Sequence, residues 1–208
     1  MLNIKKAAMF GLDARIALAI FGALSVISGA ALYSAISNAK ATSLIADLNE
    51  IGKAWEQYYL DTGQNLPQLS TSSTVYGFYV LKNNFLTEDS GVSGWNGPYL
   101  PYSATTDFQR HTRYGKVYVH IISNDEDWGI PTTTDWNPDG RCISGKKCSI
   151  WVGIDGIDDS DVGVINKIDD LIDGSDGGDK GNIRHDKIST SAKNRVWLKY
   201  APIKNPHD

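Results

Sequence analysis

Apolar and polar positions along the first 62 residues form two consecutive patterns, and both favour a helix. Residues Ile16–Ile36 are an uninterrupted stretch of 21 residues without a charged side chain. A helix rises about 1.5 Å per residue, so this stretch is long enough to cross a bilayer core of roughly 30 Å. Beyond it, apolar residues recur at spacings of 4, 3, 4 and 3 and share one helical face: Leu44, Leu48, Ile51, Trp55 and Tyr58.

The two patterns join without a proline, so together they predict one helix from about Phe10 to Thr62. Gly63 is a suitable C-cap, and Pro67 disfavours a restart nearby. The amphipathic half needs a second layer of structure to cover its apolar face.

Later segments predict a sheet that can supply this layer. We predict a short helix at Asp161–Asp173 and a type I turn at Asn137–Gly140. The pattern at Leu69–Asn96 fits either a helix or a strand. The predicted strands are rich in β-branched and aromatic residues: Lys116–Ser123, Cys148–Ile154 and Val196–Tyr200. We therefore expect an α+β fold in which a long N-terminal helix packs on a C-terminal antiparallel sheet.

The chain length of 208 residues allows one head domain plus an anchor. A secretory signal peptide or a buried core helix could also produce the uncharged stretch, but the helical pattern continues beyond Ile36, which favours a membrane span. Lys5 and Lys6 precede the span, so the N-terminus is expected in the cytoplasm and the head outside it.

The two cysteines fit an oxidising compartment. Cys142 and Cys148 flank five residues and can close a small disulfide loop at the base of a hairpin. The alternative, a metal site, would need further ligands at short spacing, and His120 and His185 are isolated in the sequence. We predict the disulfide.

Composition excludes some function classes. The formal net charge of −4 and the lack of a basic patch argue against nucleic acid as a partner. The sequence contains no nucleophile elbow, P-loop, HExxH or dinucleotide fingerprint, so we do not expect an enzyme.

Three features of the chain resemble the type IV pilins and the pseudopilins of type II secretion. A short basic leader and an acidic residue precede the span, which continues into one long amphipathic helix. GWNGPYL at Gly94–Leu100 looks like a segment of major pseudopilins, and INKIDDLIDG followed by GNIR is similar to a segment late in many such heads. The resemblance implies a subunit that polymerises into a helical filament.

The resemblance also implies how the N-terminus would be used. A prepilin peptidase would cleave between Ala8 and Met9 and methylate Met9, which makes Asp13 the fifth mature residue. Its carboxylate would pair with the amino terminus of a neighbouring Met9 in the filament core. Here Ala, Met and Asp stand where the family usually has Gly, Phe and Glu.

The expected organisation is a leader at residues 1–8, a helix at 9–63 with its membrane span at 16–36, and an extracytoplasmic head at 64–208. Such a subunit would be stored in the bacterial inner membrane. Filament assembly machinery would then build it into a periplasmic or surface filament.

Calcium is the cofactor that the acidic part of the head suggests, and major pseudopilins are known for a calcium site late in the head. Four carboxylates within seven residues are the first candidate ligands, since calcium prefers oxygen: Asp155, Asp158, Asp159 and Asp161. A second candidate, Asp135–Gly140, opens like an EF-hand loop but has Lys146 where the bidentate Glu should stand. The alternative function is therefore a monomeric, membrane-tethered periplasmic domain that binds calcium or senses a signal.

Overall fold

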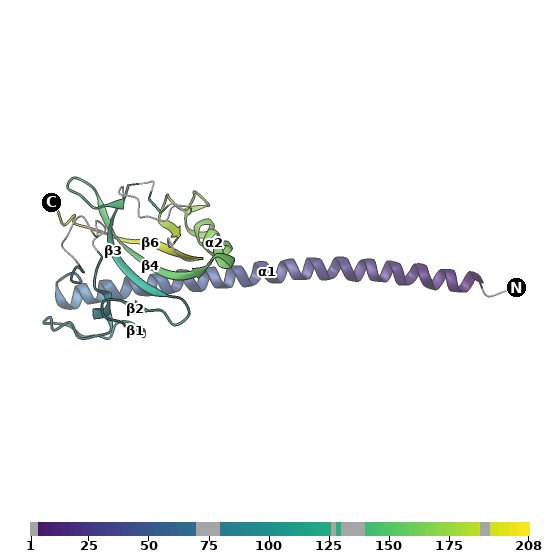
Figure 1. Ribbon diagram of the computed structural model, residues 1–208, viewed down its shortest axis with the longest axis horizontal. Coiled ribbons are helices and arrows are strands. Elements are labelled where there is room, and N and C mark those ends of the chain that lie inside the picture. The colour runs from purple at the N-terminus through teal and green to yellow at the C-terminus, as the bar shows by residue number, and fades with distance from the viewer. Residues whose placement is uncertain (1–3, 70–79, 126–127, 130–139, 188–191) are drawn as a thin grey trace. The chain divides into compact units, whose positions relative to one another are not determined.

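A computed structural model describes residues 4–69, 80–125, 128–129, 140–187 and 192–208 (Figure 1). The chain divides into two compact units, Met1–Lys40 and Ala41–Asp208, and each is described by itself below. The helix α1, Ile4–Thr62, contributes to both units. Its C-terminal end agrees with the sequence prediction, whereas it begins six residues earlier than expected.

The first unit consists of the N-terminal part of α1. Every residue from Gly11 to Ile36 is exposed, including large apolar side chains such as Leu18 and Phe21. Among the described residues, α1 is the helix whose length and apolar composition suffice to cross a membrane.

The second unit, which we call the head, contains the rest of α1. The predicted apolar stripe is confirmed, because Leu44, Leu48, Ile51 and Tyr58 are all fully buried. The helix ends at Thr62 because Gly63 adopts the left-handed conformation at φ 66° and its N–H bonds the carbonyl of Tyr59 at 2.9 Å.

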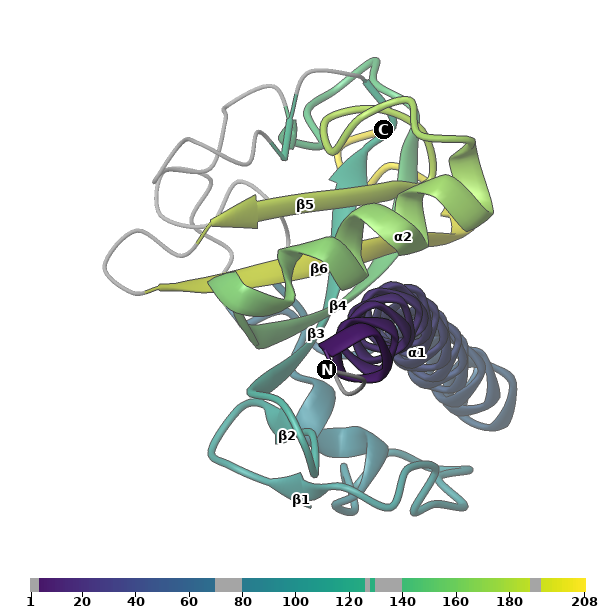
Figure 2. The same cartoon turned by 90° about the vertical axis from the view of Figure 1, so that its right-hand side faces the viewer.

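The head contains a six-stranded antiparallel sheet in the order β1-β2-β3-β4-β6-β5 (Figure 2). The bounds of the strands are β1 Ser103–Ala104, β2 Gln109–Arg110, β3 Lys116–Ser123, β4 Cys148–Asp158, β5 Ile183–Lys187 and β6 Lys193–Ile203. The helix α2, Val162–Asp173, follows β4 after the short 3₁₀ helix η3, Asp159–Asp161, and lies beside β5. Another 3₁₀ helix, η1, spans Asn83–Leu86.

The predicted elements are confirmed with longer bounds. The strand at Lys116–Ser123 is as predicted, and the other two predicted strands extend to Asp158 and over Lys193–Ile203. The predicted helix before Gly174 is α2, and the segment that fitted helix or strand contains η1. The predicted turn at Asn137–Gly140 lies outside the described residues except for Gly140.

The two faces of the sheet bury different clusters. One face packs with the buried stripe of α1, and alternate residues of β4, such as Ile150 and Val152, point into this core. The other face carries a smaller aromatic cluster that includes Trp151 and Trp197. β4 is therefore buried on both faces, which explains why its sequence is a continuous apolar run rather than an alternating one.

The predicted disulfide is present. Cys142 and Cys148 are bonded with their Cα atoms 5.9 Å apart. The bond closes a loop within the long connection between β3 and β4, and Cys148 pairs with Ser123 at the start of β4. This closed segment, Cys142–Cys148, is called the disulfide loop below.

Candidate functional site

The residues predicted for leader processing and assembly all lie in α1. Ala8 and Met9 belong to its first turns, and Asp13 is exposed on the helix just before the uncharged stretch. The helix therefore continues through the expected cleavage position in the unprocessed chain.

The carboxylates first considered for calcium bind other groups in the structure. Asp155 accepts hydrogen bonds from the backbone N–H of Lys116 and from the Tyr118 hydroxyl, the latter at 2.7 Å. Its role is to join the ends of β3 and β4.

Two further aspartates of that stretch pair with lysines. Asp158 forms an ion pair with Lys193, and Asp159 forms one with Lys187 at 2.8 Å. The hydrogen bond from Lys187 is the main reason why the pKa of Asp159 is below its usual value. Asp161 is the N-cap residue of α2, half-buried and without a capping side-chain bond. The second calcium candidate, Asp135–Gly140, falls almost entirely outside the described residues.

A different set of carboxylates comes together at the end of α2. Asp169, Asp173 and Asp176 each place a carboxylate oxygen within 4.8 Å of the others. We call these three residues the acidic cluster. It forms because Asp169 and Asp173 are four residues apart on one face of α2, and the loop after the helix turns Asp176 back toward them.

Backbone conformation explains the turn of this loop. Gly174 ends α2 in the left-handed conformation at φ 72°, and Ser175 continues at φ 66°, which a residue other than glycine adopts rarely. The Ser175 hydroxyl bonds the Asp170 carboxylate at 3.2 Å, which supports this conformation.

Asp169 is the most unusual member of the acidic cluster. Only 6% of its surface is exposed, and its Oδ1 atom has no hydrogen-bond partner among the described residues. Its Oδ2 atom accepts a bond from the Gly177 N–H at 3.3 Å. Burial raises the pKa of Asp169, the Gly177 N–H opposes this, and the neighbouring carboxylates of Asp176 and Asp173 raise it further.

Asp173 connects the cluster to the sheet. Asp173 accepts bonds from the backbone N–H groups of Asn182 and Ile183 at 2.7 and 2.6 Å. The N–H of His185 bonds the Gly178 carbonyl at 2.9 Å, so the loop covers the outer edge of β5. The cluster thus joins the end of α2 to a loop that is bound to β5.

Oxygen donors of this kind suit a calcium ion, although both oxygens of Asp173 already accept hydrogen bonds, including one from the Asn182 side chain at 3.0 Å. Calcium takes six to eight oxygen ligands, and three converging carboxylates supply part of this number. A buried carboxylate oxygen without a partner is costly unless a cation or a hydrogen bond compensates it. A divalent ion held by Asp169, Asp173 and Asp176 would provide that compensation and offset the repulsion among the three.

Sequence reasoning considered the densest run of aspartates and missed this cluster. The spacing of four residues between Asp169 and Asp173, followed by a glycine-rich loop with Asp176, was visible in the sequence. Density was the weaker signal, because Asp155 and Asp158 lie in β4 whereas Asp159 and Asp161 lie in η3, and the first three bind other groups.

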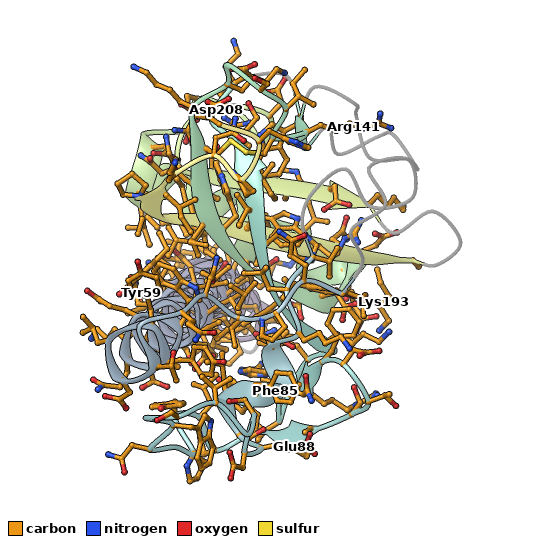
Figure 3. All side chains as sticks on the ribbon, turned by 90° about the vertical axis from the view of Figure 1, so that its left-hand side faces the viewer. Tyr59, Phe85, Glu88, Arg141, Lys193 and Asp208 are labelled. Atoms are coloured by element: carbon orange, nitrogen blue, oxygen red, sulfur yellow. A yellow bond between two sulfur atoms is a disulfide. The ribbon has the colours of Figure 1, made fainter. Side chains whose placement is uncertain are left out.

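The GWNGPYL segment has a structural place in the head. The Tyr99 hydroxyl donates to the Asp61 carboxylate at 3.0 Å and accepts from the N–H of Asn96. The Trp95 indole donates to the carbonyl of Phe85 at 2.9 Å (Figure 3). A Cβ atom on Gly94 would lie 2.2 Å from the Asp61 carbonyl oxygen, so only glycine fits. The segment therefore holds the last turn of α1.

A shallow groove of about 520 Å³ runs between α1 and this segment. It is open and has a mixed lining of charged, polar and apolar groups: Glu50, Lys53, Ala54, Gln57, Tyr99, Leu100 and Pro101. It contains no set of converging polar groups like that of the acidic cluster.

Comparisons with known proteins add no assignment. No family model, curated protein or solved structure matches the chain. Function is therefore argued from the residues and their geometry.

Proposed function

We propose that this chain is a type IV pilin-like subunit that polymerises into a filament through its N-terminal helix. The observation that carries the proposal is α1 itself. One continuous helix has an uncharged, fully exposed segment up to Ile36 and a stripe from Leu44 to Tyr58 buried in the head.

The exposed segment needs a non-aqueous environment. Apolar surface in water costs about 25 cal/mol per Å², so a helix with every apolar side chain exposed is unfavourable in solution. Lipid can cover it while the subunit is stored in the inner membrane, and neighbouring copies of the same helix can cover it in a filament. The α+β head with its disulfide would then lie outside the cytoplasm.

Processing supplies the chemistry of assembly in this proposal. A prepilin peptidase would release residues 1–8 and leave Met9 with a new, methylated amino group. Asp13 lies four residues further along the helix, at the start of the uncharged stretch. Its carboxylate would pair with the amino group of an adjacent copy, and this ion pair would reward correct docking in a low-dielectric core.

We propose in addition that the acidic cluster binds calcium and stabilises the head. The unpartnered, buried Oδ1 atom of Asp169 is the observation that supports this. The same observation favours the second candidate function, a monomeric membrane-tethered domain whose head binds calcium. The two candidates differ in what they require of the N-terminus.

The test of the filament is the replacement Asp13→Ala in the native host, with Asp13→Glu as its matched variant. We expect the Ala variant to insert into the membrane and fold normally while sheared filament yield falls. The Glu variant keeps the charge and should retain much of the yield. N-terminal mass spectrometry of the wild type should show that Met1–Ala8 has been removed.

One result would contradict the filament, and two others would contradict the proposed role of Asp13 in assembly. If the wild-type protein keeps residues 1–8 and is found in the membrane without any filament, the membrane-tethered monomer is favoured. Unchanged filament yield in Asp13→Ala would show that Asp13 is only an interfacial residue. Loss of inserted protein in that variant would instead place Asp13 in biogenesis.

A further inference from the structure

Charge is unevenly distributed over the head. The disulfide loop and its flanks carry Arg141, Lys146 and Lys147, and no acidic residue lies between Arg141 and Cys148. Lys146 is paired with Asp125 at 2.9 Å. Arg141 and Lys147 form no ion pair with another described residue, so they give this loop a net positive charge.

The disulfide loop is also rigid. The Asn205 side chain donates to the carbonyls of Ile143 and Lys146 at 2.7 and 2.9 Å. The Asp208 carboxylate accepts from the hydroxyl of Ser144 at 2.9 Å (Figure 3). Together with the disulfide, these bonds hold an apolar side chain, Ile143, at the surface with 50% of it exposed.

A complementary surface lies on and after α2. Between Lys167 and Lys180 there are five aspartates and no other basic residue. One of them, Asp170, is paired with Lys167, while Asp179 forms no ion pair with another described residue. Leu171 is 52% exposed in the middle of this acidic surface. Five aspartates and two lysines give this segment a net formal charge of −3. A bound calcium ion would add two positive charges and leave the segment negative.

The disulfide loop and the start of β5 are separated along the sheet within one head, and Asp125 lies between them, paired with Lys146 and bound through its carbonyl by Arg184. The acidic loop enters β5 at Ile183, which pairs with Leu198, and Leu198 pairs with Val152 of β4. Val152 lies four residues along β4 from Cys148, and Ile183 lies two strands across the sheet from Val152. The backbone distance from Cys148 to Ile183 is therefore about 16 Å, at roughly 3.3 Å per residue and 4.8 Å per strand. In Figure 1 the C-terminus and α2 likewise lie at different ends of the head.

We propose that the disulfide loop of one copy docks on the acidic α2 surface of a second copy of this chain. Opposite charges would steer the contact, and Ile143 and Leu171 would provide its apolar centre. Ile143 and Leu171 are two of the four large apolar side chains recorded as exposed in the described part of the head. Two different patches that join copies make a heterologous contact, which continues from subunit to subunit.

This inference rests on the proposed filament and names a contact between its heads. Charge reversal at either surface should weaken it, and reversal at both should restore it. The three variants are Arg141→Glu with Lys147→Glu, Asp170→Lys with Asp179→Lys, and all four changes together. Neither Asp170 nor Asp179 is one of the three candidate calcium ligands, although Asp170→Lys also removes the acceptor of the Ser175 hydroxyl in the loop that carries Asp176.

The readout is zero-length carbodiimide crosslinking of the full-length chain in its native membranes, followed by mass spectrometry. In the wild type we expect a ladder of multimers and crosslinked peptides that join Lys147 to Asp170 or Asp179. Each single-surface reversal should lower the ladder by about fivefold to tenfold, because like charges then face each other and no amine faces a carboxylate for coupling. Recovery in the fourfold variant, where amine and carboxylate are exchanged, is therefore the deciding result. The fourfold variant should return to within about twofold of the wild type.

A matched control reverses two exposed cations elsewhere in the head, Lys53→Glu with Arg110→Glu, and makes the same change in net charge. It should leave the ladder unchanged. A wild-type ladder that lacks the Lys147 crosslinks, or one that persists in both single-surface variants, overturns the head contact and leaves the filament standing. Absence of any multimer in the wild type overturns the filament and the head contact together.

Discussion

The acidic cluster gives the sharpest prediction about the head, because two opposite effects meet at one side chain. Asp169→Asn keeps the size of the side chain and removes its charge. Without calcium, the charged wild-type side chain is buried beside Asp176 and Asp173, which burial and repulsion both disfavour. The variant should therefore be at least as stable as the wild type in chelator, and it should lose most of the response to calcium.

The expected size of the calcium response follows from mass action. An ion at about 100 times its dissociation constant that binds only the folded state adds about 2.7 kcal/mol. For a domain of this size each kcal/mol shifts the melting temperature by about 2–4 °C, so calcium should raise it by about 5–10 °C. Extracellular calcium modules have dissociation constants of about 10⁻⁴ to 10⁻³ M, so reaching 100 times these values takes titration to roughly 10–100 mM calcium.

The assay is thermal unfolding of the full-length chain in detergent, followed by near-ultraviolet circular dichroism of its tryptophans. Asp158→Asn is the matched control, since it removes an exposed ion pair with Lys193 that is worth at most about 1 kcal/mol. The control should keep the calcium response. An equal calcium response in Asp169→Asn and wild type would refute the cluster, and loss of the response only in Asp158→Asn would move the site to the earlier aspartates.

Two further predictions concern packing and pH. Gly52→Ala should destabilise the head by up to about 2 kcal/mol in urea unfolding, because overpacking of 1–3 kcal/mol outweighs a gain in helix propensity of about 1 kcal/mol. The added Cβ atom would lie 2.1 Å from the Tyr200 ring. The control is Gly22→Ala, whose Cβ atom would meet nothing within 4 Å. An equal loss of unfolding free energy in the two variants would contradict the prediction. Burial lowers the pKa of the His111 imidazole below 6.5, helped by Arg113 and opposed by Asp47, so the unfolded chain binds more protons. The free energy of unfolding should therefore fall as the pH drops from about 8 through 6.5 toward 5, and it should fall less steeply in His111→Asn. Parallel plots of unfolding free energy against pH for the variant and the wild type would contradict this.

Periodicity was sufficient to predict the long helix, and the content of β-branched and aromatic residues was sufficient to predict the central strands. The stripe from Leu44 to Tyr58 is buried as its spacing requires, and Gly63 ends the helix. The strand at Cys148–Ile154 was predicted because it is rich in β-branched and aromatic residues, and the structure shows that it is buried on both faces. In each of these cases one local pattern determines the element.

The elements that were missed have no such pattern. The strand β5 reads IRHDK and is mostly polar, and it exists because β6 pairs with it on one side while the loop from α2 covers the other. The strands β1 and β2 contain two residues each, which is too short for alternation to be seen. Their positions depend on contacts between distant parts of the chain.

The same limit explains the outcome at the candidate site. The sequence shows that Asp155 and Asp159 are close along the chain, but not that Tyr118 and Lys187 bind them. Conversely, the burial of Asp169 depends on how α2 packs beside β5. Which carboxylates are satisfied and which remain without a partner is a property of the tertiary structure.

The filament and the tether make different demands on the start of the uncharged stretch. A tether needs only apolar residues there, and a charge at bilayer depth costs roughly 2.5–3.5 kcal/mol, less near the interface. A filament in which helices pack against one another needs a group that favours a single register, and a carboxylate can do this when an amino group of the next copy neutralises it. Asp13 lies at the start of the membrane span, three residues before Ile16, and is exposed in the isolated chain. The cost of keeping a carboxylate at this position is offset only if a partner is present, and among the proposed functions the filament is the one that supplies the partner.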